Sequence, residues 1–64
     1  MVVEDIIKAL DGSINVKIYT KFGSNKTPMT YYEGLAHDVP YRNIHLNIVA
    51  PIDVRDNCLF IEVD

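Results

Sequence analysis

Hydrophobic residues follow two different periods along the chain, and the change of period divides it into elements. Near the start they recur at spacings of three and four, as on one face of a helix, at Val2, Val3, Ile6, Ile7 and Leu10. Glu4 and Asp5 lie in the first turn, where carboxylates oppose the positive end of the helix dipole, and Gly12 is a natural terminator. We expect an amphipathic N-terminal helix that packs its apolar stripe on a sheet.

From Ile14 the period becomes two, which is typical of a strand with one buried face and predicts a strand up to Lys21. Residues 22–28 are turn formers and predict a hairpin connection to a second strand at Met29–Glu33. Alternation returns at Asn43–Ala50 and again at Leu59–Val63, after a polar turn over residues 53–57. The pattern predicts one α+β domain over residues 1–64, in which the helix packs on an antiparallel meander of three to four strands.

The predicted sheet has two apolar faces. We expect the helix to cover the row Ile14, Val16, Ile18, Ile44, Leu46, Ile48, Leu59, Ile61 and Val63. The opposite row then carries Tyr19, Tyr32, His45, Val49, Cys58 and Phe60. This second row is too apolar to be left wholly in water. Three outcomes remain open: the sheet curls into a small barrel, the face pairs with a second copy, or it binds a different protein.

The corner from Gly34 to Pro40 joins the second and third predicted strands. It contains Gly34, Asp38 and Pro40, three residue types that strongly constrain a backbone. We expect the Asp38 carboxylate to cap a short turn that the proline opens. The corner therefore has an architectural role, because it ends one strand and aims the next.

Composition narrows the class of partner. A 64-residue chain hides only about 60% of its unfolded surface on folding, so its apolar residues, 48% of the total, must nearly all be buried in the monomer or against a copy. The formal charge of −3 argues against binding to a phosphate backbone, so nucleic acid is an unlikely partner. No apolar run reaches membrane-spanning length, and the first residues lack the pattern of a signal peptide. We expect a cytoplasmic protein.

Candidate chemistry is sparse. Cys58 is the only cysteine, which excludes an internal disulfide, and it has no nearby activating residue in the sequence. His37, Asp38 and His45 offer too few ligands at too uneven a spacing for a metal site. We expect neither an enzyme nor a cofactor or metal protein.

The remaining hypothesis is a non-catalytic protein-binding module, with a homodimeric structural or assembly domain as the alternative. Aromatic residues and arginine dominate binding hot spots. On that basis the predicted contacts are Tyr19, Tyr32 and Phe60 on the sheet, with His37, Asp38, Tyr41 and Arg42 at its rim. Acidic residues that could imitate nucleic-acid phosphates are Glu33, Asp38, Asp53 and Asp56.

Two segments, Tyr32–Pro40 and Asn57–Val63, resemble parts of small proteins of Gram-positive bacteria, their phages and other mobile elements. In those proteins a Y-x-G-x-x-x-D-[IV]-P segment lies between strands and an L-x-I-x-[IV] strand closes the chain. The resemblance implies an accessory factor encoded by a phage or mobile element. Acidic proteins of this size from such elements often inhibit a host protein, and anti-CRISPR proteins are the best-known class.

Overall fold

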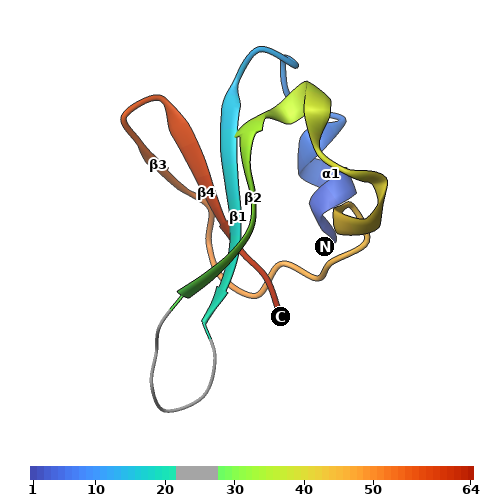
Figure 1. The fold of residues 1–64 in the computed structure, drawn as a ribbon, viewed down its shortest axis with the longest axis vertical. Helices are drawn as coiled ribbons and strands as arrows, with labels where there is room; N and C mark the ends of the chain where they lie inside the picture. The colour runs from blue at the N-terminus through green and yellow to red at the C-terminus, as the bar shows by residue number, and fades with distance from the viewer. Residues whose placement is uncertain (22–27) are drawn as a thin grey trace.

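A computed structural model describes residues 1–21 and 28–64 (Figure 1). The helix α1 spans Val3–Ile7, and the strands are β1 (Asn15–Lys21), β2 (Pro28–Leu35), β3 (Asp53–Arg55) and β4 (Cys58–Glu62). Two short 3-10 turns, η1 (Ala36–Asp38) and η2 (Tyr41–Asn43), follow β2. The loop expected over residues 22–28 lies outside the described residues, apart from Pro28, at which β2 begins.

Within the described residues the strands form one open sheet in the order β2-β1-β4-β3. The β1–β2 and β3–β4 pairs are antiparallel, whereas β1 and β4 run parallel. The expected antiparallel meander is therefore wrong, and so is the barrel, because β2 and β3 are separate edges. Alternation along a strand fixes which residues face inward, but it does not fix the direction or the neighbour of that strand.

The strand predicted at residues 43–50 is absent from the sheet. Burial alternates over residues 44–49 as expected, with Ile44, Leu46 and Ile48 half-buried and His45, Asn47 and Val49 exposed, but Asn43 is buried against the pattern. Within the described part of the chain its backbone pairs through isolated bridges, Val2 with Asn47 and Ile48 with Val63. The segment therefore links the N-terminal residues to the end of β4 by single bridges and forms no continuous β-ladder with either.

This crossing segment also completes the start of α1. The amides of Val3 and Glu4 donate to the carbonyls of Leu46 and Ile44, both at 2.9 Å. These amides have no partner inside a helix, so the contact satisfies them. The helix is five residues long, in place of the longer amphipathic helix expected, and no described helix is long and apolar enough to cross a membrane.

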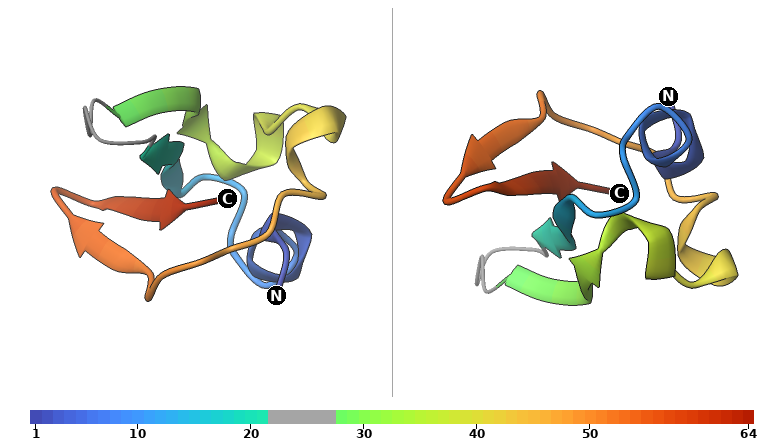
Figure 2. Two further views of the ribbon diagram at one scale, coloured as in Figure 1. Left: turned by 90° about the horizontal axis from the view of Figure 1, so that it is seen from below. Right: turned by 90° about the horizontal axis from the view of Figure 1, so that it is seen from above.

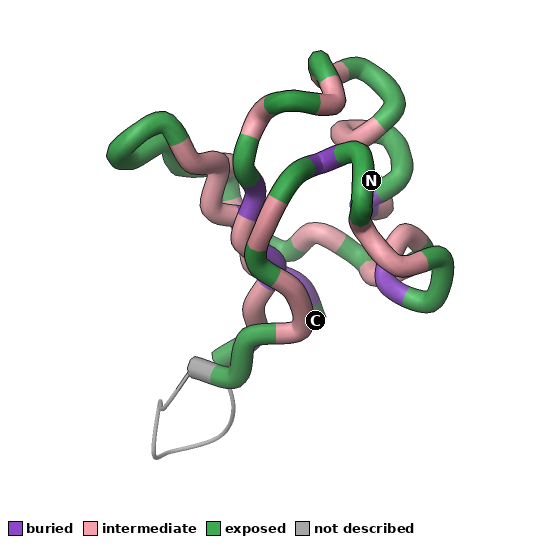
Figure 3. Tube along the Cα trace, turned by 45° about the horizontal axis from the view of Figure 1, so that its top comes forward, coloured by how far each residue is buried: buried purple, intermediate pink, exposed green. Residues whose placement is uncertain are grey.

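The core lies on the sheet face that α1, η1 and η2 share (Figures 2 and 3). Ile18 and Ile61 are direct neighbours across the parallel β1–β4 pair, and both are fully buried. Among the residues that the structure describes, the buried apolar residues are Val3, Val16, Ile18, Ala36, Ile61 and Val63. No described helix or turn covers the other face of the sheet (Figure 2).

A bulge in β2 changes which of its residues face the core. Ile18 pairs with Tyr32 and the next residue, Tyr19, pairs with Thr30, so Tyr31 is an extra residue in β2. Both Tyr31 and Tyr32 are half-buried and pack against the core. Without the bulge, strict alternation would send two adjacent tyrosines to opposite faces.

The corner after β2 is held by backbone contacts. Ala36 N–H donates to the Ile14 carbonyl at 2.8 Å, and His37 N–H donates to the Gly12 carbonyl at 3.1 Å. The expected cap by Asp38 is wrong, because neither 3-10 turn has a side-chain cap and Asp38 is an exposed residue at the end of η1. The corner redirects the chain as predicted. It is held by hydrogen bonds to carbonyls of the segment before β1, in place of a cap by Asp38.

Candidate functional site

The face of the sheet opposite the core is the candidate functional site. In β1, Val16, Ile18 and Thr20 are buried, so the residues between them point to the other side. Cross-strand register then assigns the neighbours on β2, β4 and β3. This outer face consists of Asn15, Lys17, Tyr19, Lys21, Thr30, Glu33, Leu35, Asp53, Arg55, Cys58, Phe60 and Glu62.

Phe60 lies at the centre of a cluster of rings and cations on the outer face. Its ring meets Tyr19 edge to face, with 6.4 Å between centroids and an interplanar angle of 72°. Lys17, its direct partner on β1, places Nζ 5.6 Å from the Phe60 centroid. Arg55 on β3 places Cζ 4.7 Å from the same centroid. Each cation–π contact at an exposed site contributes about 0.5–1 kcal/mol, so Phe60 holds both cationic groups above the sheet.

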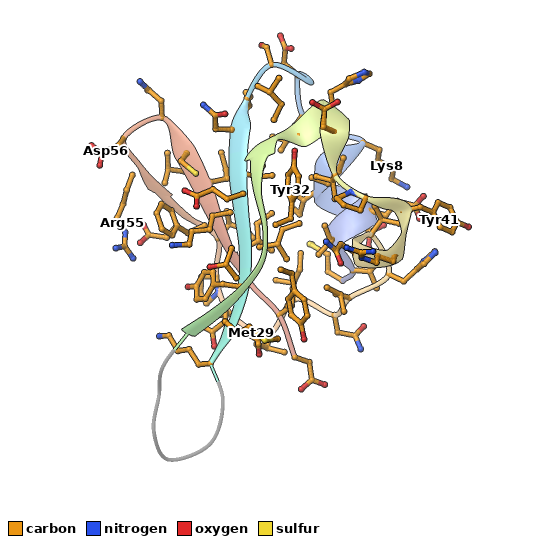
Figure 4. The ribbon with its side chains drawn as sticks, in the orientation of Figure 1. Lys8, Met29, Tyr32, Tyr41, Arg55 and Asp56 are labelled. Atoms are coloured by element: carbon orange, nitrogen blue, oxygen red, sulfur yellow. The ribbon has the colours of Figure 1, made fainter. Side chains whose placement is uncertain are left out.

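These residues enclose a shallow pocket of about 190 Å³. Its lining is Lys17, Tyr19, Lys21, Arg55 and Phe60, and we refer to it as the cationic pocket. Figure 4 shows Arg55 on the β3 side of the sheet, well away from α1. Three of the six Lys and Arg residues of the chain therefore meet around two aromatic rings.

Two of the three cations form ion pairs. Arg55 donates from Nε to Asp53 Oδ2 at 2.8 Å, and this hydrogen bond lowers the pKa of Asp53. Lys21 Nζ lies 3.8 Å from Glu62 Oε1, a long and exposed ion pair of the kind that contributes about 0–1 kcal/mol. Lys17 forms no ion pair with any described residue.

The outer face as a whole is charge-balanced. Its three carboxylates are Glu33, Asp53 and Glu62, set against three cations. None of these carboxylates lines the cationic pocket, so the three cations form its lining and the carboxylates lie around it.

Cys58 also lies on the outer face and is half-buried. Burial raises the pKa of its thiol, with a further increase from the charge of Glu33 and a smaller opposing effect of Lys17. The thiol is therefore protonated at neutral pH. Among the described residues, no three His, Cys, Asp or Glu side chains are grouped as metal ligands would be.

The structure brings together Tyr19 and Phe60, as predicted, but the expected placement of Tyr32 beside them is wrong. Tyr32 pairs with Ile18 on the core side, and its hydroxyl donates to the Leu35 carbonyl at 2.7 Å (Figure 4). Burial raises the pKa of this hydroxyl, with a smaller contribution from Asp38. This hydrogen bond holds the end of β2 in place, and Tyr32 is not part of the outer face.

The corner residues His37, Asp38, Tyr41 and Arg42 do not form a rim of the outer face either. They belong to η1 and η2, beside α1, and Figure 4 shows Tyr41 on the opposite side of the molecule from Arg55. Tyr41 is 76% exposed and packs edge to face on His45, with centroids 5.1 Å apart. His45 and Val49, also expected on the second sheet face, lie outside the named strands. Partner binding by these corner residues stays a prediction.

Arg55 is the residue that sequence reasoning missed. It was assigned to a polar turn, whereas the turn is only Asp56–Asn57, both with positive φ (51° and 62°). Two such residues form the type I′ turn that suits a two-residue hairpin. That turn places Arg55 opposite Cys58, and therefore on the same face as Phe60.

Comparisons with protein-family models, curated proteins and solved structures gave no match. A function for the chain therefore has to be derived from the geometry of the outer face.

Proposed function

We propose that the protein is a non-catalytic protein-binding module that recognises its partner through the outer face of the sheet. The observation that carries this proposal is the cationic pocket, in which Tyr19, Phe60 and Arg55 meet on a face that no described helix or turn covers. Tyrosine and arginine are enriched at the centres of protein interfaces, where they supply large contact areas and several hydrogen-bond donors.

A capture experiment with two matched variants tests the proposal. The first variant is Tyr19→Ala with Phe60→Ala, which removes the aromatic pair of the outer face. The control is Tyr41→Ala with His45→Ala, which removes the aromatic pair on η2 and the segment after it. Each tagged variant is first checked for an unchanged circular dichroism spectrum, then used to capture proteins from a lysate of the encoding organism for quantitative mass spectrometry.

We expect a protein that the parent and the control retain, and that the outer-face variant loses by at least about tenfold, because a hot-spot truncation costs about 2 kcal/mol or more. Loss in the η2 variant alone would move the binding site to the corner and overturn the proposal for the outer face. Equal capture by all three forms would do the same.

The resemblance of residues 32–40 and 57–63 to proteins of phages and mobile elements extends this proposal. On that extension the protein is an accessory factor, similar to anti-CRISPR proteins, that inhibits a host protein by occupying its surface. The proposed phosphate mimicry is supported least, because Glu33, Asp38, Asp53 and Asp56 lie on four different elements or turns and Asp53 is bonded to Arg55.

A homodimer is the second candidate, and the charge balance of the outer face favours it. A two-fold symmetric interface must be complementary to itself, and a face with three cations and three carboxylates carries opposite charges for both copies. Sedimentation velocity at high micromolar concentration decides this. A monomer across the whole range would eliminate the dimer and leave the first proposal intact.

A further inference from the structure

The cationic pocket has donor capacity that the described residues do not use. Arg55 binds Asp53 through Nε, and its two terminal nitrogens make no hydrogen bond within the described part of the chain. Lys17 lies opposite Glu33 on β2 but forms no ion pair with a described carboxylate. An arginine with free terminal nitrogens beside a lysine that makes no ion pair is suited to an oxygen anion.

The pocket is also preorganised. The Phe60 ring holds the Lys17 ammonium at 5.6 Å and the Arg55 guanidinium at 4.7 Å from its centroid. Ordering a long side chain on binding costs conformational entropy, and part of this cost is avoided when the side chain is already packed. An incoming anion therefore meets cationic groups that are already in place.

The size of the pocket limits its occupant. At about 190 Å³ it is smaller than the pockets of about 300–1,000 Å³ that enclose cofactors and drug-sized ligands. It has room for a single large side chain, with Tyr19 and Phe60 offering apolar contact and the cations ringing it.

The charges around the pocket distinguish a carboxylate from a phosphate chain. Asp53 and Glu62 form ion pairs with two of the cations, and Glu33 lies directly opposite Lys17 on β2. A nucleic acid, with a charge at every nucleotide, would meet these carboxylates and the net charge of −3. A segment with only one or two carboxylates beside an aromatic ring places its charges at the pocket and none over the surrounding acidic residues.

We infer that the cationic pocket binds an acidic segment of a partner protein, in which an aspartate or glutamate stands next to an aromatic residue. The inference rests on the proposed function and names the chemistry of the partner at the same site. The aromatic side chain contacts Tyr19 and Phe60, while the neighbouring carboxylate accepts hydrogen bonds from Arg55 and Lys17.

The test uses capped eight-residue peptides and amide chemical shifts of the ¹⁵N-labelled protein. The probe contains one aspartate next to one phenylalanine among serine and glycine residues, and a matched peptide has asparagine in place of the aspartate. An octamer of thymidylate and a second peptide with lysine in place of aspartate complete the set. We expect the aspartate peptide to shift the amides of Lys17, Tyr19 and Phe60 and to bind at least about fivefold more tightly than the asparagine peptide.

Two double variants of equal net charge distinguish the effect of the pocket cations from the effect of the net charge of the protein. Lys17→Gln with Arg55→Gln removes two cations of the pocket, and Lys8→Gln with Arg42→Gln removes two exposed cations elsewhere. The first should weaken binding of the aspartate peptide by about fivefold or more, because two contacts of about 0.5 kcal/mol each are lost. The second should change it less than twofold.

Three results would overturn the inference. They are equal binding of the asparagine peptide, tighter binding of the oligonucleotide at the same amides, and no titration by any probe. None of them decides the proposed function, because capture that depends on Tyr19 and Phe60 would still identify a protein partner of different chemistry. Loss of that dependence with peptide binding intact would instead show a pocket that the captured protein does not use.

Discussion

Tyr32 and Gly34 form a local pair at the end of β2, and their substitution tests the placement of Tyr32 on the core side. The Tyr32 hydroxyl donates to the Leu35 carbonyl at 2.7 Å, across Gly34. A Cβ built on Gly34 would lie 2.8 Å from that hydroxyl oxygen and 3.2 Å from Cζ, and the φ of Gly34 is +157°. Alanine at this position would therefore meet both an unfavourable backbone angle and the tyrosine.

The size of each effect follows from these contacts. Tyr32→Phe removes one hydrogen bond and should lower the free energy of unfolding by about 1 kcal/mol. Gly34→Ala should cost about 2–3 kcal/mol, because backbone strain costs about 1–3 kcal/mol and the displaced hydroxyl loses its acceptor as well. The double variant should cost about 1 kcal/mol less than the sum, since both changes remove the same hydrogen bond.

Urea unfolding followed by circular dichroism measures all three variants, with Tyr31→Phe as the matched control. Tyr31 is half-buried on the same strand, and its hydroxyl makes no hydrogen bond to a described residue, so its loss should cost less than about 0.5 kcal/mol. Two results together would show that the Tyr32 hydrogen bond does not hold the end of β2. The unfolding free-energy changes of Tyr32→Phe and Gly34→Ala would add within about 0.3 kcal/mol, and Tyr32→Phe would cost no more than Tyr31→Phe.

Three further predictions concern other parts of the fold. The Ser13 amide and hydroxyl lower the pKa of Asp11, so this stabilisation is present above the unfolded pKa of about 3.9 and is lost as the pH falls. Asp11→Asn, which removes the titrating group, should flatten the acid side of a Tm–pH curve, and an unchanged curve would refute it. Asn57→Gly should raise the free energy of unfolding by about 0.5–1 kcal/mol, because φ is +62° there, and a loss in urea unfolding would contradict the turn assignment. In the same assay, Ile61→Val should lower the free energy of unfolding by about 0.5–1.5 kcal/mol. Val54→Ala, at a residue 62% exposed, should change that free energy by less than about 0.5 kcal/mol, and the reverse order would be inconsistent with this core.

Period-two patterning predicted the burial of β1 and the inward row of β4 well. Val16, Ile18 and Ile61 are buried as expected, and Tyr19 and Phe60 do share the opposite face. These features depend only on the alternation of side chains along an extended backbone, which the sequence carries directly.

The sequence-based predictions are wrong where strand pairing, or a shift in the alternation of side chains, decides the structure. The alternation describes the burial of residues 44–49 correctly and fails at the buried Asn43, and the segment bonds to the N-terminal residues and to the end of β4 through isolated bridges. The extra residue Tyr31 changes the phase of β2, and no local signal in the sequence marks that bulge. Arg55 could have been found, because Asp56–Asn57 is a two-residue turn signal that also fixes the register of its flanking residues.

The charges outside the outer face bear on selectivity. Six of the nine acidic residues of the chain lie elsewhere on the fold, whereas three of the six basic residues line the cationic pocket. Outside the pocket the described Lys and Arg residues are Lys8 and Arg42, so an acidic partner that approaches another surface meets mostly charge of its own sign, and juxtaposed like charges are unfavourable. The pocket thus supplies attraction and the rest of the molecule supplies repulsion, a combination that orients a partner better than attraction alone.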